Sequence, residues 1–174
     1  MPTAEFQLNF LRRIQWLLES SSYTSTYKFA LLISVTNLSI ESELNDNREC
    51  VISYEQLAEQ FIQLYWTQAL PFSDQYGESI LKQSSTTGQA KVITSILTLQ
   101  EETKTTNLNI ARTHHIKKWQ STIKEIAQTI KNNPAKYLQS AEDKVSREFF
   151  YIYNSREKAI ILKCGIAYCF ARFS

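Results

Sequence analysis

The sequence predicts a mainly α-helical protein: an irregular multi-helix bundle around a buried central helix (about 26–40), with a C-terminal β-hairpin (about 148–163) and a short final helix. Of its 174 residues, 43% are hydrophobic and 12% aromatic, enough to build a sizeable core. The chain has only three glycines and three prolines, which favours long uninterrupted elements over an all-β fold with many tight turns. The apolar residues of 26–40 go nearly all the way round a helix, as in a helix with neighbours on several sides.

The first helix is predicted over residues 4–20, and the serine-rich residues 20–25 should break it. Ser25 or Thr26 is the expected N-cap of the central helix, because its hydroxyl can accept a hydrogen bond from the first turn. The central helix is too short to cross a bilayer, which needs about 20 apolar residues. Its apolar residues are Phe29, Ala30, Leu31, Leu32, Ile33, Val35, Leu38 and Ile40.

An acidic loop (41–49) and a short extended piece (51–52) precede a helix over 53–69, with Ser53 as N-cap and Pro71 beyond its end. This helix has the pattern of the first helix of a helix-turn-helix, with the later hairpin as a wing. No second helix rich in Arg, Asn or Gln follows at turn distance. An ordinary capped amphipathic helix is therefore the alternative interpretation.

Two further helices are predicted in the second half of the chain, over residues 89–99 and 110–131, with a polar connector over 101–109. Asn132–Pro134 should stop the long helix, and a short helix over 135–139 follows. The long helix keeps its apolar residues to one seam, formed by Ile116, Trp119, Ile123, Ile126 and Ile130.

Aromatic and β-branched residues over 148–153 and 158–163 predict the two strands of the hairpin. Side chains alternate across a strand, so one face is expected to display Phe149, Tyr151 and Tyr153. We interpret residues 1–140 as a helical domain. Residues 141–174 either pack on the same core or lead to a further C-terminal domain.

The net charge of +2 is unevenly distributed. Residues 1–100 carry six Lys/Arg and ten Asp/Glu, whereas residues 101–174 carry thirteen and seven. A polyanion would therefore bind the second part. The candidate phosphate contacts are Lys117, Lys118, Lys124 and Lys131, and the alternative interpretation is a solvated helix face.

We find no catalytic residues. His114 and His115 are the only histidines, and neighbouring residues on a helix point about 100° apart, so they are a poor metal pair. Cys50, Cys164 and Cys169 have neither the number nor the spacing of a disulfide framework or zinc site. With no signal peptide or membrane segment, the expected location is the cytoplasm.

Four short motifs stand out along the chain: Thr26-Tyr27-Lys28-Phe29-Ala30-Leu31-Leu32, Ile52-Ser53-Tyr54-Glu55-Gln56-Leu57-Ala58-Glu59-Gln60-Phe61, Tyr65-Trp66 and Gly88-Gln89-Ala90-Lys91-Val92-Ile93. Together they resemble the N-terminal region of a family of bacterial HNH endonuclease proteins. The closing motif, Ile160-Ile161-Leu162-Lys163-Cys164-Gly165-Ile166-Ala167-Tyr168, is similar to the segment that leads into that family's later helices. The resemblance implies a mainly helical module of a DNA-processing or defence nuclease, whose HNH site and divalent metal lie C-terminal to this region. None of that site's residues has a counterpart here, so no cofactor is expected in this chain.

The resemblance thus implies a non-catalytic scaffold or recognition module that positions DNA, a nuclease domain or a partner subunit. The rival interpretation is a protein-interaction or assembly domain with no nucleic-acid contact. It would expose Tyr151 and Phe173 to a protein partner, including a second copy of the chain.

Overall fold

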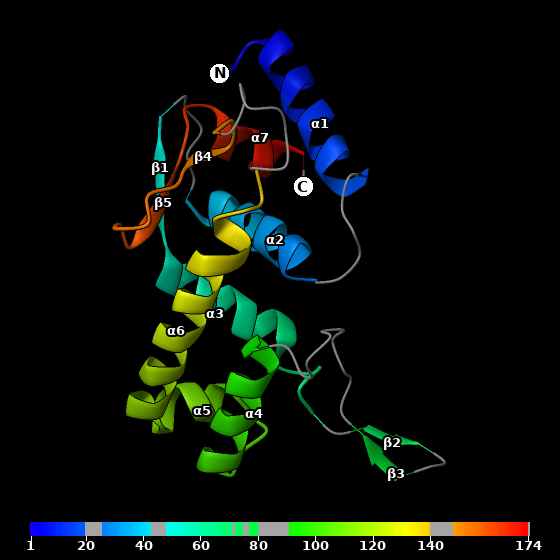
Figure 1. The fold of residues 1–174 in the computed structure, drawn as a ribbon, viewed down its shortest axis with the longest axis vertical. Helices are drawn as coiled ribbons and strands as arrows, with labels where there is room; N and C mark the ends of the chain where they lie inside the picture. The colour runs from blue at the N-terminus through cyan, green and yellow to red at the C-terminus, as the bar shows by residue number, and fades with distance from the viewer. Residues whose placement is uncertain are drawn as a thin grey trace.

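The computed structural model describes residues 1–19, 26–42, 48–70, 72–74, 77–79, 91–139 and 148–173. Within these residues the protein is mainly α-helical, as predicted, with a small antiparallel sheet beside the helices (Figure 1). The helices are α1 (Ala4–Glu19), α2 (Tyr27–Glu41), α3 (Tyr54–Tyr65), α4 (Lys91–Thr103), α5 (Leu108–His114), α6 (Ile116–Ile130) and α7 (Ile166–Arg172). The strands are β1 (Cys50–Ser53), β2 (Phe72–Asp74), β3 (Gly77–Ser79), β4 (Tyr151–Ile152) and β5 (Ala159–Leu162).

Helix α3 occupies the middle of the helical body and packs against α2, α4 and α6. Ser53 caps it as predicted: the Gln56 N–H donates to the Ser53 hydroxyl, and the Gln56 side chain accepts from the Ser53 N–H. The helix ends at Tyr65, and a turn continues to Ala69, close to the predicted end. Because α3 packs against three neighbouring helices, it is a core helix of the fold.

Helix α2 is the predicted central helix, and it packs on α3 and α7. The prediction that it is buried all round is wrong on one side, because Ile33 is 46% exposed and Ile40 is 49% exposed. Thr26 stands at the N-cap position but makes no side-chain cap. Its hydroxyl lies 2.6 Å from that of Tyr65 instead, which joins α2 to α3.

The predicted connector and long helix are corrected by the structure. Helix α4 extends to Thr103, and α5 begins at Leu108 with Asn107 as its cap, so the connector is much shorter than residues 101–109. His115 leaves the helical conformation (φ −120°, ψ 43°) and separates α5 from α6. The break places Ile116 outside the apolar seam, with 55% exposure.

The end of α6 agrees with its prediction, because Asn133 is extended (φ −167°, ψ 120°) and the helix does not continue through it. One helical turn follows, in which the Leu138 N–H donates to the Pro134 carbonyl over 2.9 Å. This turn stands where the short helix over 135–139 was predicted.

The predicted hairpin forms, with shorter strands, and β5 is the central strand of a sheet ordered β1-β5-β4. The pairing of β1 with β5, Ile52 opposite Ile160, was not predicted. The buried side chain of Gln139 binds the backbone at β4, the edge strand on the opposite side of the sheet from β1. Its amide nitrogen donates to the Tyr151 carbonyl (2.6 Å), and its oxygen accepts from the N–H groups of Phe150 (3.1 Å) and Tyr151 (3.3 Å).

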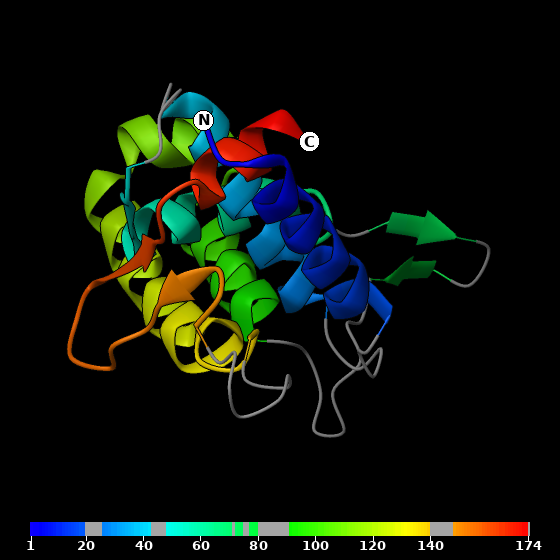
Figure 2. The ribbon, with the colours of Figure 1, turned by 90° about the horizontal axis from the view of Figure 1, so that it is seen from above.

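Helix α7 packs on α2, and α1 lies across α7 at the top of the molecule (Figures 1 and 2). Gly165, at φ 80°, turns the chain from β5 into α7. Phenylalanine rings hold α1 in place: Phe10 lies 5.0 Å from Phe170 and 5.8 Å from Phe150, and Phe6 lies 5.8 Å from Phe149. One hydrophobic core therefore contains residues from both predicted segments, 1–140 and 141–174.

Three predictions fall outside the described residues. They are the break over 20–25, the centre of the acidic loop at 43–47, and the segment around Gly88.

Candidate interaction surfaces

An open apolar groove of about 350 Å³ lies between α1, α2 and α7. We call it the α1–α2–α7 groove. None of the described side chains that line it is charged. They are Phe10, Leu11, Ile14, Leu18, Phe29, Leu32, Ile33, Thr36, Cys169, Phe170 and Phe173.

The two long walls of the groove have helical spacing. Helix α1 contributes Leu11, Ile14 and Leu18, which are three and four residues apart. Helix α2 contributes Phe29, Ile33 and Thr36, and Ile40 continues the same row beyond the groove. Rows with this spacing are what helices use to pack against a further helix.

Helix α7 and Phe173 after it also line the groove. Phe173 is 42% exposed, and its ring lies 6.4 Å from that of Phe10 in a stacked orientation. Cys169 is fully buried beside it, and burial raises the pKa of its thiol to about 11. The thiol is therefore an apolar part of the wall at neutral pH and not a nucleophile.

Exposed apolar residues concentrate on these three helices. Single exposed apolar side chains are normal on a protein surface, but a cluster of them is not. Among the described large hydrophobic residues that are exposed, six lie on α1 and α2 or directly after α7: Leu8, Leu11, Leu18, Ile33, Ile40 and Phe173.

The two predicted interface residues differ in the structure. Phe173 lies at the groove, whereas Tyr151 is 1% exposed and its hydroxyl donates to the Ala135 carbonyl over 2.7 Å. Burial raises the pKa of Tyr151 far above its ordinary value. The prediction that Tyr151 is displayed to a partner is therefore wrong, because its side chain joins the core beneath the turn at Pro134.

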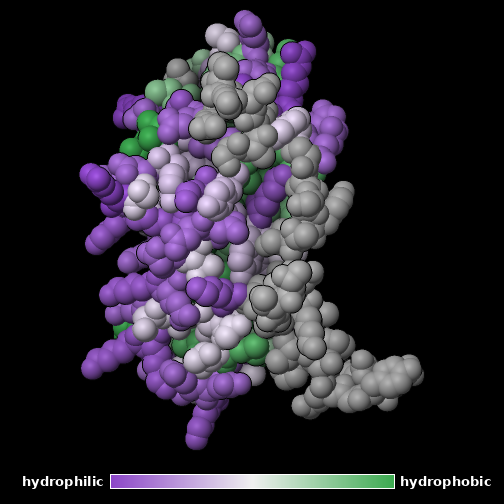
Figure 3. Space-filling model, in the orientation of Figure 1, coloured by the Kyte–Doolittle hydropathy of each residue, from purple (hydrophilic) through white to green (hydrophobic). Residues whose placement is uncertain are grey.

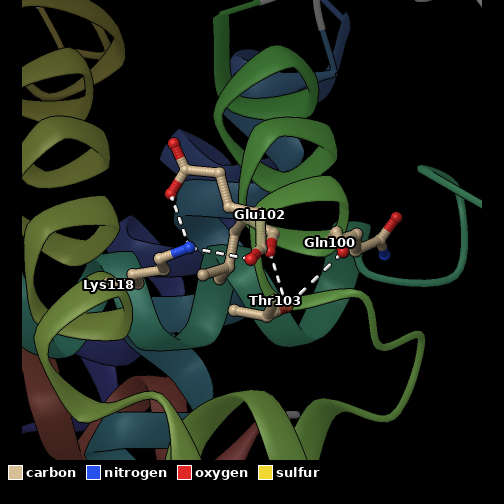
Figure 4. A network of polar contacts seen from close by, with 5 residues as sticks. Gln100, Glu102, Thr103 and Lys118 are labelled. Carbon is tan, nitrogen blue, oxygen red and sulfur yellow. Dashed lines mark hydrogen bonds and ion pairs between the residues drawn. The ribbon is translucent and has the colours of Figure 1, made fainter.

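The four candidate lysines divide into two groups. Lys117, Lys124 and the C-cap residue Lys131 follow one another at intervals of seven, so they share one side of α6 and its C-terminal end, which we call the lysine row. Lys118 points to another side (Figure 4). Its ammonium group donates to the Glu102 carbonyl at the end of α4 (2.7 Å) and lies 3.5 Å from the Glu102 carboxylate.

Acidic side chains flank the lysine row. Lys124 and Arg112 line a cleft of about 440 Å³ with Glu55 and Glu59 of α3, and Arg112 lies 3.5 Å from Glu59. Lys131 lies over the ring of Tyr54, 5.7 Å from its centre. Hydrophilic side chains dominate the face in Figure 3, including the left-hand side where α6 runs. Lys117 and Lys124 are exposed and Lys131 is half-buried.

The chain matches the model of a family described as Domain of unknown function (DUF8808), over residues 7–166. The chain belongs to this family. No curated protein and no solved structure matches it. In this DUF8808 chain the matched residues include both long walls of the groove, while Phe170 and Phe173 lie just beyond them.

His114 is the last residue of α5, and His115 lies at the break before α6. His114 is exposed, with its Nδ1 2.8 Å from the Thr113 hydroxyl, and His115 is half-buried. The described residues contain no group of three His, Cys, Asp or Glu side chains that could hold a metal ion. Among the described helices, none has the length and apolar character to cross a membrane.

The sequence interpretation missed the α1 wall of the groove. Leu18, at one end of this wall, is 42% exposed. A second row of apolar residues, beginning at Leu8 and Leu11, was the available signal. A helix that packs one apolar side against the core does not need a second apolar row.

Proposed function

We propose that this protein is a non-catalytic interaction module whose α1–α2–α7 groove receives an apolar helix of a protein partner. The observation that carries this proposal is the concentration of exposed apolar residues on α1, α2 and the end of α7. Uncharged walls favour an occupant that presents an apolar side. The matching i, i+3/i+4 spacing of the walls favours a helix.

The binding energy would come from completing the burial of side chains that are now partly exposed. Full burial of a Leu, Ile or Phe side chain contributes about 1.5–3 kcal/mol, so a half-exposed one has about 1 kcal/mol left to contribute. Ile33, in the middle of the α2 wall, is the best single position to remove this contribution.

A selection of displayed helical peptides tests the proposal. The full chain is used as bait against a library of randomised amphipathic helices. Enriched peptides should carry apolar residues at i, i+3/i+4 and i+7, and Ile33→Glu should weaken their binding at least about tenfold, which is 1.4 kcal/mol or more.

Ile110→Glu is the matched control, because Ile110 is 41% exposed on α5 and lies outside the groove. It should leave peptide binding unchanged. Failure to enrich any helix, or enriched peptides that bind the Ile33→Glu variant as well as the original, would reject the proposal.

We propose nucleic-acid backbone contact as a second candidate function, favoured by the placement of Lys117, Lys124 and Lys131 on one side of α6. Three phosphate contacts on duplex DNA give a slope of about −3 in log K against log salt. Glu55 and Glu59 beside the row keep the affinity low. A salt titration with duplex DNA measures the slope, and Lys124→Glu should reduce its magnitude by about 1 or more.

Lys118→Glu is the control for this second candidate, since Lys118 is engaged with Glu102 on another side of the helix. It removes the same charge from the same helix and should leave the slope nearly unchanged. Absence of binding at low salt, or equal effects of both substitutions, would exclude the lysine row as a DNA contact.

We also propose a relation to HNH endonucleases, which rests on the short motifs alone. Under it, the chain positions DNA or a partner, and the HNH centre with its divalent metal is supplied by a C-terminal domain or a partner subunit. We place the protein in the cytoplasm, a proposal supported by Cys50, Cys164 and Cys169, which are all unpaired.

A further inference from the structure

Helix α1 carries two apolar rows on different sides. The inner row, with Phe10 and Leu17, is buried against α7 and the hairpin. The outer row consists of Leu8, Leu11, Gln15 and Leu18, all exposed and spaced three, four and three residues apart. This is the spacing of a coiled-coil seam, with one polar residue in it.

We propose that the occupant of the groove is a second copy of this chain. The α1 helices of two copies pack against each other across a two-fold axis, and the outer row of each enters the groove of the other. This inference rests on the proposed interaction function and names its partner.

The available apolar area agrees with what a stable dimer needs. A standard interface buries about 800 Å² on each partner, of which about 60% is apolar, so each side contributes on the order of 500 Å² of apolar surface. The six exposed apolar residues of α1, α2 and the segment after α7 are 39–56% exposed. At about 200 Å² for a fully exposed large side chain, they present on the order of 500 Å² together.

The surface is also compatible with itself, which a two-fold interface requires. The described side chains that line the groove are uncharged, so the grooves of two copies meet without placing like charges opposite each other, and Arg12 and Glu19 lie beside the outer row. Gln15 is the one polar residue in the outer row, and its amide nitrogen donates to the Glu19 carboxylate over 2.8 Å. A single polar residue at such a position typically fixes the register of two helices and lowers their affinity.

Helix α1 is held firmly enough to act as half of such an interface. Its inner side contacts the hairpin through Phe6 and through Arg13, whose guanidinium lies 4.3 Å from the centre of the Phe149 ring. The outer row is thereby presented in a fixed orientation, so its ordering adds little entropic cost to association.

Sedimentation equilibrium of the full chain over a wide concentration range tests the inference. The chain should sediment as a dimer, and the double variant Leu11→Glu/Leu18→Glu should sediment as a monomer with an unchanged circular dichroism spectrum. Ile110→Glu is the control with similar exposure and should remain dimeric.

A gain of affinity provides a test that misfolding cannot imitate. Gln15→Leu completes the apolar row and should tighten the dimer about tenfold or more, whereas Arg12→Leu adds the same side chain beside the row and should not. A dimer that responds equally to both variants, or that survives Leu11→Glu/Leu18→Glu, would overturn the inference.

A wild-type chain that stays monomeric at every concentration would overturn it too. The proposed interaction function is then decided separately by the peptide selection. If helical peptides bind the monomer and Ile33→Glu abolishes that binding, the proposed interaction function stands. The occupant of the groove is then another protein and not a second copy.

Discussion

At the scale of single residues, Gln139 is a side chain on which the sheet depends. It is 4% exposed and satisfies the N–H groups of Phe150 and Tyr151 and the carbonyl of Tyr151. Gln139→Ala leaves three buried backbone groups without this partner, and each such group costs about 1–3 kcal/mol. We expect urea unfolding to show a loss of at least about 3 kcal/mol.

Gln128→Ala is the matched control, because Gln128 is exposed and bonds only Asn132 on the surface among the described contacts. Its loss should change the unfolding free energy by less than about 0.5 kcal/mol. Similar losses for the two variants would show that Gln139 does not hold the strand.

Two buried tyrosines should respond differently to loss of the hydroxyl. The Tyr151 hydroxyl donates to the Ala135 carbonyl, whereas the buried Tyr54 hydroxyl has no hydrogen-bond partner among the described residues. Tyr151→Phe should therefore cost about 1 kcal/mol or more, and Tyr54→Phe should be neutral or stabilising. Thermal unfolding of the two variants measures which one loses more stability. A greater loss of stability for Tyr54→Phe than for Tyr151→Phe would contradict the prediction.

Tyr151 also shows what a strand pattern cannot determine. Alternation along 148–153 predicted a strand, but only Tyr151–Ile152 form one, and the neighbouring residues Phe150 and Tyr151 are both buried. The choice of the inward face depended on α7 and the turn at Pro134, which pack against the hairpin from distant positions in the sequence. Local alternation contains no information about those contacts.

At the scale of elements, α1 is attached to the body mainly by phenylalanine rings. Phe10 is 2% exposed and contacts the rings of Phe150, Phe170 and Phe173. Phe10→Ala should cost about 3–5 kcal/mol, and α1 should detach before the rest unfolds. Hydrogen exchange should therefore accelerate in α1 more than in α3.

Leu8→Ala on the same helix is the control, since Leu8 is 56% exposed and lies on the outer row. It should leave hydrogen exchange in α1 close to that of the original protein under conditions where the chain is monomeric. Uniform acceleration over α1 and α3 in Phe10→Ala would show that α1 is not a separate unit.

Helix positions were largely predictable, and their ends were less so. The seam of α6 and the cap at Ser53 have local signals, so both were found. The break at His115 was missed because the seam continued from Ile116 in the sequence while the chain turned at His115. Asn107, the cap of α5, was an available signal, since its side chain accepts from the Ile110 N–H.

At the scale of the whole molecule, the sequence predicted the fold class but not the surface. Composition and periodicity determine which residues can be buried, and they gave the mainly helical core. The groove arises where α1 and α2 meet α7, from three segments whose relative placement no local pattern encodes. Only Phe173 of the predicted site residues lies there.

Buried tyrosines and Cys169 should make the folded protein sensitive to alkali. Burial raises the pKa values of Tyr27, Tyr54 and Tyr151. At Tyr27 the hydrogen bond from the Val92 N–H acts in the opposite direction but is the smaller effect. Burial also raises the pKa of the Cys169 thiol to about 11. In the unfolded chain these groups lose their protons near pH 9 for the thiol and near pH 10 for the phenols.

Because each folded pKa lies above the unfolded one, the unfolded state loses protons first as pH rises. The stability that these groups provide is complete below about pH 9 and falls above it, by about 1.4 kcal/mol per pH unit for each titrating group. Urea unfolding between about pH 8 and pH 11 should show this decline. The double variant Tyr54→Phe/Tyr151→Phe should make this decline less steep above about pH 10, since two of the groups are gone. An unchanged slope would mean that these phenols ionise as easily in the folded protein as in the unfolded chain.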